Sequence, residues 1–231
     1  MRCITLFHSR EEKKGTNMTI NTEDLLNSIL ESLDRIEYIR AMDIPDIELY
    51  MDQVTTFMES HLKHSTRNPE EDKILTKTMI NNYAKNDLLP PPVRKKYSKE
   101  HVMLLIFIYY YKGILSISDI QQLMRPITSK FFGLTGDYSL ENIYEEAFGL
   151  EQEQIDILKA DIMERFRKSE QTFQDAPEDS RDFLQTFAFI CMLSFDVYVK
   201  KLLIEKMIDG MRGSEKSRED RKQKSKMAEE K

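Results

Sequence analysis

The sequence predicts an all-α protein, and three observations support that fold class. Glycine and proline are scarce, at seven residues each in a chain of 231, so few turns of the kind that join strands are available. Apolar residues recur every three or four positions over much of the chain, which is the spacing of amphipathic helices. Serine, threonine and aspartate, which cap helices, precede several of these segments.

The composition narrows the classes of function. The chain is acidic, with a formal net charge of −6. Its two cysteines, Cys3 and Cys191, lie far apart in the sequence, which excludes a disulfide scaffold and a four-thiolate zinc site. Two lone thiols favour a reducing compartment, so we expect a cytoplasmic protein. The most apolar run, residues 183–199, is too short to cross a bilayer and contains Gln185 and Asp196, so it predicts a helix buried on most sides.

Residues 1–22 precede the periodic part of the chain, and we expect them to form a disordered extension. Their charges follow a short apolar patch, which is the reverse of a secretory signal. Lys14 and Gly15 can be encoded by a purine-rich tract at ribosome-binding distance before Met18. A native start at Met18 is therefore an open alternative.

The first predicted helix covers residues 23–40, and Pro45 separates it from the second. One face of the first helix carries Leu26, Ile29, Leu33 and Ile36. Asp46 is expected to cap the second helix. The residues expected to be buried along that second helix are Met51, Val54, Phe57, Met58 and Leu62.

Two further helices are expected to begin at Thr76 and Ser98, after a polar loop at residues 64–72. The connection between them contains three prolines in a row, which cannot be helical. The helix after Ser98 is apolar on most sides, which indicates burial. A short fifth helix begins at Ser116 or Ser118 and is expected to stop at Pro126.

The last part of the chain is predicted to be helical as well. The expected elements are a linker at residues 127–138, helices at 139–148, 151–173 and 180–211, and a solvated or disordered charged tail at 212–231.

The segment LTKTMINNYAKNDLLPPPVRKKYSKEHV (residues 75–102) is basic within this acidic chain. Residues 76–100 hold six lysines or arginines against two acidic residues. At 100° per residue, Lys77, Thr78, Asn81, Asn82 and Lys85 share one helix face, which spans roughly 140° and holds no carboxylate. Asparagine can hydrogen-bond adenine, threonine can contact thymine methyl groups, and lysine neutralises phosphate. The face indicates DNA binding, with an ordinary solvated surface as the alternative.

This segment resembles the reading helix and wing of the MerR (mercury-resistance-regulator) family. LTKTMINNYAKNDLLPP follows that family's VSxxTLRYYExxGLLPP-like pattern, and VRKKYSKEHV matches its wing through Tyr97 and Ser98. ILSISDIQQLM matches a later segment of the same family, so the ordered series covers about residues 75–124. A closer resemblance is to a family of bacterial proteins known only as a domain of unknown function, whose hallmarks are the LYMDQVTTFME and LTKTMINNYAK strings.

The sequence departs from the MerR pattern at three positions of the reading helix and its cap. Asn81 and Asn82 stand where that family has an arginine and an aromatic residue. Asp87 replaces a glycine, although aspartate also adopts left-handed caps. The wing lacks the family's Gly-Tyr-Arg string, and Lys95 is the nearest basic substitute. Base preference should therefore differ from that of MerR proteins.

The resemblance implies an all-α protein with a winged helix-turn-helix core, a small β wing at most, and a C-terminal helical region. It implies a transcription regulator that binds double-stranded promoter or operator DNA as a homodimer. A small-molecule effector of unknown identity is a candidate partner, since such regulators often sense ligands in their helical region. The implied DNA contacts are Lys77, Thr78, Asn81, Asn82 and Lys85 on the helix and Arg94, Lys95 and Lys96 on the wing.

The expected layout follows from these assignments. It comprises the extension at residues 1–22, an amphipathic helix at 23–43, the DNA-binding domain at 44–126, a dimerisation or sensing region at 138–211 and the tail at 212–231.

The alternatives to a DNA-binding protein are an enzyme and an interaction module. The sequence contains no Gly-rich phosphate loop and no nucleophile-elbow or HExxH motif, so we expect neither catalysis nor a cofactor. His61, His64 and Glu59 could form a metal trio, but an incidental surface grouping explains them better. Cys191 is expected to be an inert core thiol. An α-helical protein–protein interaction module without DNA binding is the remaining alternative.

Overall fold

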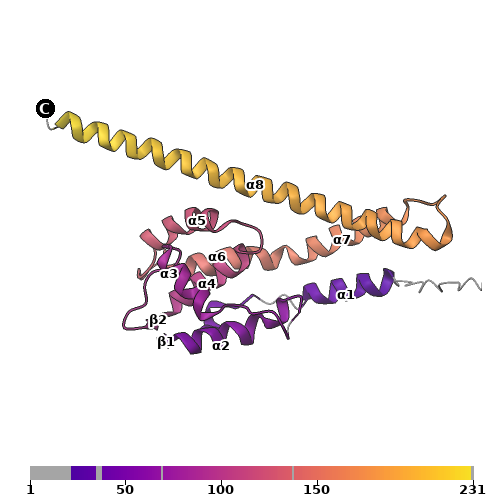
Figure 1. Ribbon diagram of the computed structural model, residues 1–231, viewed down its shortest axis with the longest axis horizontal. Coiled ribbons are helices and arrows are strands. Elements are labelled where there is room, and N and C mark those ends of the chain that lie inside the picture. Colours follow the sequence, from indigo (N-terminus) through magenta and orange to yellow (C-terminus); the bar gives the residue numbers. More distant parts are fainter. Residues whose placement is uncertain (1–21, 35–37, 69, 137, 230–231) are drawn as a thin grey trace, which may run out of the picture.

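The computed structural model describes residues 22–34, 38–68, 70–136 and 138–229, and it is mainly helical with one small antiparallel sheet (Figure 1). The predicted fold class is therefore confirmed. The expectations for residues 1–21 fall outside the described residues. Among the residues described, no helix is both long and apolar enough to cross a membrane.

The central element of the molecule is α4 (Lys99–Tyr111), which is apolar on all sides. Its eight consecutive residues from His101 to Ile108 are all buried, which confirms the predicted burial. Around it lie α2 (Met51–Leu62), α3 (Lys77–Lys85), α5 (Ile117–Lys130), α6 (Leu140–Glu153) and two short strands, β1 (Leu49–Tyr50) and β2 (Lys96–Tyr97). Residues from these elements form one large hydrophobic cluster.

Strand β1 occupies residues that were expected to form the start of the second helix. β1 pairs with β2 in antiparallel register, with Leu49 opposite Tyr97 and Tyr50 opposite Lys96. Leu49 and Tyr97 are both buried, so the pairing covers the N-terminal end of α4. The expectation that Asp46 caps the second helix is wrong, because Tyr50 is the N-cap residue of α2 and Asp46 lies in a bend before β1.

The ends of α3 are set by local hydrogen bonds. Thr76 is the N-cap, as predicted, and its Oγ1 accepts a hydrogen bond from the Met79 N–H at 3.2 Å. At the other end the Leu88 N–H donates to the Tyr83 carbonyl at 2.9 Å, which closes a Schellman motif. The motif needs a left-handed residue, and Asp87 supplies it with φ of 53°. The predicted left-handed cap at Asp87 is therefore confirmed.

A proline lies inside α5 without ending it. The helix continues past Pro126 to Lys130, so the predicted stop at Pro126 and the start of the linker at residue 127 are wrong. Proline removes one N–H donor from the ladder, but the Phe131 N–H still bonds the Ile127 carbonyl at 3.0 Å. The turn that follows Pro126 thus keeps its backbone hydrogen bonding, and the helix continues through it.

A second, smaller bundle extends away from this core. It consists of α1 (Thr22–Asp34), α7 (Ile155–Glu170) and the first part of α8 (Glu178–Glu229). Its buried residues are Ile162, Phe166 and Phe189, with Leu26, Met192 and Leu193 partly buried beside them. The predicted first helix does not reach residue 40, since residues 38–40 are not helical.

Helix α8 is the longest element and connects the two parts of the molecule. Its 52 residues would extend about 78 Å at the usual rise. Ile208 is buried in the large cluster, and the Arg212 Nη2 lies 2.8 Å from the Asp119 Oδ1 at the start of α5. The same Nη2 donates to the Ser118 carbonyl at 3.3 Å. The C-terminal half of α8 is therefore anchored on α5, while its N-terminal part packs on α7.

Three expectations for α8 are wrong. Residues 183–199 are not buried on most sides, because only the face toward α7 is covered. Cys191 is exposed and is not a core thiol. The predicted end of this helix at residue 211 is wrong, because the backbone of residues 212–229 continues the helix, consistent with a segment made mostly of strong helix formers such as lysine, glutamate and arginine.

His101 lies beneath the wing and is nearly fully buried. Its Nδ1 accepts the Ser98 N–H at 3.0 Å, so in the neutral ring the proton must reside on Nε2. Among the described residues Nε2 has no hydrogen-bond partner, and the ring packs edge-on against Tyr97 and Phe132. Burial lowers the pKa of His101, because the surroundings disfavour the charged form.

The burial of His101 predicts a specific dependence of stability on pH. Since the pKa is lower in the folded than in the unfolded chain, the unfolded chain binds more protons between the two values. The free energy of unfolding should fall as pH drops below about 6.5, by up to about 1.4 kcal/mol per pH unit. In H101Q, whose glutamine can keep the capping bond to Ser98, urea unfolding at pH 7.5 to 5 should show a shallower decline. Parallel curves for the two proteins would contradict this account.

Candidate nucleic-acid interface

The outward face of α3 carries the five predicted contact residues of the reading helix. Lys77, Thr78, Asn81, Asn82 and Lys85 are all exposed. On the opposite side Ile80 and Tyr83 are buried in the large cluster. The predicted division of this helix into a polar and an apolar face is therefore confirmed, and it follows from the 3.6-residue period of the sequence.

The polar groups of this face are largely available to a ligand. Among the described residues, the side chains of Asn81 and Asn82 make no hydrogen bond, and Lys85 makes no ion pair. The Asn82 carbonyl is used internally, since it accepts the Asn86 Nδ2 at 2.7 Å. Two amide side chains and one ammonium group thus stand free along one helix face.

Lys77 differs from its neighbours because it has a partner. Its ammonium group forms an ion pair with the Asp52 carboxylate in the first turn of α2. Both side chains remain largely exposed, at 61% and 74%. The pair ties the start of α3 to the start of α2, and it places one negative charge beside the basic face.

The wing is a tight hairpin whose tip is basic. Val93 and Lys96 form an antiparallel bridge, and the Lys96 N–H donates to the Val93 carbonyl at 2.9 Å. The two residues between them, Arg94 and Lys95, have φ of 52° and 65°. Two left-handed central residues are what a type I′ turn requires, and Asn-Gly is the pair usually found there.

Arg94 and Lys95 therefore adopt a left-handed backbone conformation that their residue types do not favour. For residues other than glycine, asparagine and aspartate the left-handed conformation costs about 1 kcal/mol or more. Both side chains are exposed, so no burial compensates for that cost. A strained pair of cations at a hairpin tip is a feature often found at binding sites.

The wing and the reading helix meet through β1. Lys96 pairs with Tyr50 in the sheet, and its Nζ lies 5.7 Å from the centre of the Tyr50 ring. Two residues later Asp52 binds Lys77, so residues 50–52 bridge the two basic elements. Lys96 also lies 3.4 Å from Glu48. Figure 1 shows α3 and the two strands at the same end of the molecule, away from α1.

Helix α5 supports the C-terminal end of α3. The Gln121 Nε2 donates to the Asn86 carbonyl at 2.8 Å, which satisfies one of the free carbonyls at the end of the helix. This contact joins α5, on which α8 is anchored, to α3, which carries the polar face.

Sequence reasoning missed Asp52 and Gln121 as parts of this site. Both act through contacts between elements that are distant in the chain, by 25 and 35 positions. An aspartate in a first helical turn and a glutamine on a polar helix face are common, so no local pattern marks either residue. The left-handed backbone of Arg94 and Lys95 could not be predicted either, because their sequence lacks the Asn-Gly pair typical of a type I′ turn.

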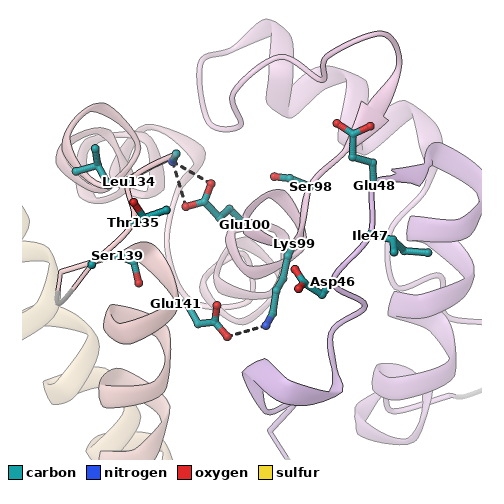
Figure 2. Close-up of a pocket in the computed structure, with 12 residues that line it drawn as sticks. Asp46, Ile47, Glu48, Ser98, Lys99, Glu100, Leu134, Thr135, Ser139 and Glu141 are labelled. Atoms are coloured by element: carbon teal, nitrogen blue, oxygen red, sulfur yellow. Dashed lines mark hydrogen bonds and ion pairs between the residues drawn. The ribbon is translucent and has the colours of Figure 1, made fainter.

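A polar pocket of about 480 Å³ opens at the base of the wing (Figure 2). It is lined by Asp46, Glu48, Lys99, Glu100 and Glu141 among others. The Lys99 Nζ lies 2.6 Å from Glu141, and both oxygens of Glu100 accept the Gly133 N–H, at 3.0 and 2.9 Å. Burial raises the pKa of Glu100; the Gly133 bond opposes that rise, and the Glu141 charge adds to it. An acidic pocket of this kind repels phosphate, so it is no part of a nucleic-acid site.

The histidines at the end of α2 do not assemble into a metal site. The His61 ring lies 4.3 Å from the Phe57 ring at a tilt of 35°, and its Nδ1 lies 2.9 Å from the Phe57 carbonyl. Within the described ranges, no group of three or more His, Cys, Asp or Glu side chains is placed to hold a metal ion. The expectation that the chain is not an enzyme stays a prediction.

Comparison with known proteins gives one match. Residues 39–147 match the model of a family described as a domain of unknown function (DUF1836). No curated protein and no solved structure matches the chain. The matched range begins just before β1, contains α2 to α5 with the wing, and ends within α6, so it includes every residue of the candidate interface and leaves out α1, α7 and α8. Over this range the chain is similar to an uncharacterised domain, and its likeness to MerR proteins rests on the residues quoted above.

Proposed function

We propose that this protein is a sequence-specific DNA-binding regulator of transcription, with α3 as its reading helix. The observation that supports the proposal is the polar face of α3, which presents free amide and ammonium groups and no carboxylate of its own. The MerR-like resemblance implies the same role, along with a cytoplasmic protein that responds to a small-molecule effector. Catalysis plays no part in this proposal.

The proposed contacts follow from the chemistry of each group. An α-helix fits the major groove, where asparagine can pair with the N6 and N7 edge of adenine. Asn81 and Asn82 are the candidates for that role, and Thr78 can contact a thymine methyl group. Lys85 carries no competing partner among the described residues and would bind phosphate.

The wing would add contacts to the DNA backbone. Arg94 and Lys95 stand at the tip of a two-residue turn, so their backbone is held in position relative to β2. A fixed pair of cations loses little conformational freedom in the backbone when it binds phosphates. They would lie against phosphates or in the adjacent minor groove.

The amide groups of α3 should determine base preference. A selection of genomic fragments with the purified protein identifies a bound sequence, and N82A should then weaken binding to it by about 1–3 kcal/mol. Binding to unrelated DNA should change little. K85A should instead weaken both, because a phosphate contact carries no sequence information. Fluorescence anisotropy with the selected and a scrambled duplex measures both effects.

A control removes positive charge outside the candidate interface. R167A with K168A takes two cations from α7, which lies outside the candidate interface, and should leave affinity almost unchanged. If the selection yields no preferred sequence and N82A with K85A binds as the parent does, α3 is not a reading helix. The interaction-module alternative would then be favoured.

The wing can be tested without disturbing its backbone. R94N with K95G creates the Asn-Gly pair that favours a type I′ turn, so the hairpin should be retained while two cations are lost. If both side chains neutralise phosphates, the slope of log affinity against log salt should become shallower by about 1.8. The control is again R167A with K168A, whose slope should equal that of the parent. An unchanged slope in the wing variant would exclude Arg94 and Lys95 from the interface.

Asp52 should weaken DNA binding in the parent protein. Its exposed carboxylate competes with phosphate for Lys77 and adds a negative charge beside the polar face. Exposed ion pairs contribute up to about 1 kcal/mol, so D52N should bind DNA about two- to fivefold more tightly at low salt. The part of the gain that comes from the ion pair should disappear in a K77A background, which a double-mutant cycle measures. An equal gain with and without Lys77 would show that Asp52 does not act through this ion pair.

A further inference from the structure

His101 connects the wing to the N-terminal end of α4. Ser98 is the N-cap residue of that helix, and its N–H donates to the His101 Nδ1 at 3.0 Å. The Ser98 Oγ lies 2.8 Å from the same nitrogen. Tyr97, the last residue of β2, lies edge-to-face with the His101 ring, with 5.5 Å between the ring centres. One imidazole therefore contacts both residues through which the wing enters α4.

The neutral ring of His101 fits this position, and the protonated ring does not. Both nitrogens of a protonated histidine carry a proton, so Nδ1 can no longer accept a hydrogen bond. The Ser98 N–H would then face a second N–H donor. The other nitrogen, Nε2, is buried and has no hydrogen-bond partner among the described residues, so the added charge would be cut off from water.

The groups packed against His101 supply no compensating negative charge. Tyr97 stays neutral, because burial raises the pKa of its hydroxyl. Phe132, which follows α5, is apolar, and its ring centre lies 4.8 Å from that of His101. Burial lowers the pKa of His101, and the carbonyls of Pro91 and Pro90 offset only part of that effect. Neither carbonyl has the geometry of a hydrogen bond to Nε2.

Glu100 precedes His101 on the first turn of α4 and is occupied elsewhere. Its two oxygens accept the Gly133 N–H at 3.0 and 2.9 Å (Figure 2). Burial raises the pKa of Glu100, so uptake of a proton there favours the folded state, in the opposite sense to His101. Lys99, before it, lies 2.6 Å from Glu141. The acid response of this turn therefore has two opposed parts, which substitutions can separate.

The wing is attached by few contacts besides this junction. Strands β1 and β2 pair over two residues each. The turn at Arg94 and Lys95 has a left-handed backbone, which costs free energy. Tyr97 is the wing residue buried in the large cluster. An element with so few buried contacts can open locally while the helices around it stay folded.

We propose that protonation of His101 displaces the wing from α4, so that acidification weakens the binding of DNA. The protonated ring reaches water only if a neighbour moves, and the Ser98 backbone is the neighbour whose donor it repels. A shift of Ser98 and Tyr97 carries the turn at Arg94 and Lys95 with it. The weakening of DNA binding rests on the proposed function, whereas the displacement of the wing does not.

Amide hydrogen exchange of the full chain measures the displacement without DNA. The Lys96 N–H donates to the Val93 carbonyl at 2.9 Å and reports on the wing. The Lys112 N–H donates to the Ile108 carbonyl at 2.9 Å, at the far end of α4, and is the internal control. From pH 7.5 to 5 the protection factor of Lys96 should fall about five- to thirtyfold, because His101 regains its ordinary pKa when the wing opens. The protection factor of Lys112 should change less than about twofold.

Substitutions separate His101 from the other groups that titrate. In H101Q the amide can accept the Ser98 N–H but takes up no proton, so the protection of Lys96 should stay constant over this pH range. H64Q is the matched control, since His64 is an exposed histidine beyond the far end of α2, and it should behave as the parent does. E100Q, which can still accept the Gly133 N–H, should also keep the fall.

Several results of the exchange measurement would overturn the proposal. They are unchanged protection of Lys96 in the parent, equal losses at Lys96 and Lys112, and a loss in H101Q as large as that in the parent. Circular dichroism checks that H101Q is folded. If it is not, the comparison of Lys96 with Lys112 in the parent decides the outcome.

Fluorescence anisotropy with the selected duplex tests the consequence for DNA binding. At constant salt the affinity of the parent should fall at least about threefold from pH 7.5 to 5, because only molecules with the wing in place bind fully. H101Q should show no such fall, and neither should R94N with K95G, whose wing has lost its two cations. A parent that binds no duplex at pH 7.5 would refute the proposed function. Equal falls in the parent and H101Q would overturn the acid response of the wing alone.

Discussion

The burial of α4 is the constraint on which the rest of the structure depends. A helix that is apolar on every side is stable only if other elements cover all of its faces. Eight consecutive residues, His101 to Ile108, are buried, and every turn of this stretch needs a neighbour. The short sheet covers the N-terminal end, α6 covers one side, and the cluster that includes α2, α3 and α5 covers the remainder. The wing is held in place because Tyr97, its last residue, belongs to that cover.

The polar face of α3 is exposed and takes no part in burying α4. The helix is attached by Ile80, Tyr83 and the leucines that follow Asp87, all of which are buried. Substitutions on the outward side therefore cost little in folding, and the residues there can be chosen by what they bind. The same reasoning applies to Arg94 and Lys95, whose backbone conformation costs stability and whose exposed side chains provide no burial to offset that cost.

The sequence was sufficient wherever the determining interaction is local. The cap at Thr76, the left-handed residue at Asp87, the two faces of α3 and the burial of the helix after Ser98 all follow from periodicity and capping chemistry, and the structure agrees. Predictions were wrong at the start of α2, where pairing with a distant strand decides the structure, and at Pro126, where the backbone hydrogen bonds of α5 continue past the proline. Leu49 and Tyr50 form a strand because Lys96 and Tyr97 are available to pair with them, and no local pattern reveals that partner.

The run from Phe183 to Val199 shows a different limit. Its composition indicates burial, but α7 covers only one face within a single chain. The apolar pattern was therefore informative about a surface that must be covered, although not about what covers it.

Polar contacts connect α8 to the candidate interface through α5. Arg212 of α8 binds Asp119 at the start of α5, and Gln121, two residues later, binds the end of α3. Hydrogen bonds from Ser116 and the nearby Arg212 both lower the pKa of Asp119, so this carboxylate stays charged and the link persists across the neutral pH range. Any rotation of α8 about its axis would move Arg212 and Ile208 together, since both lie on the face packed against the core. The position of α3 is thus connected, through α5, to the C-terminal half of α8.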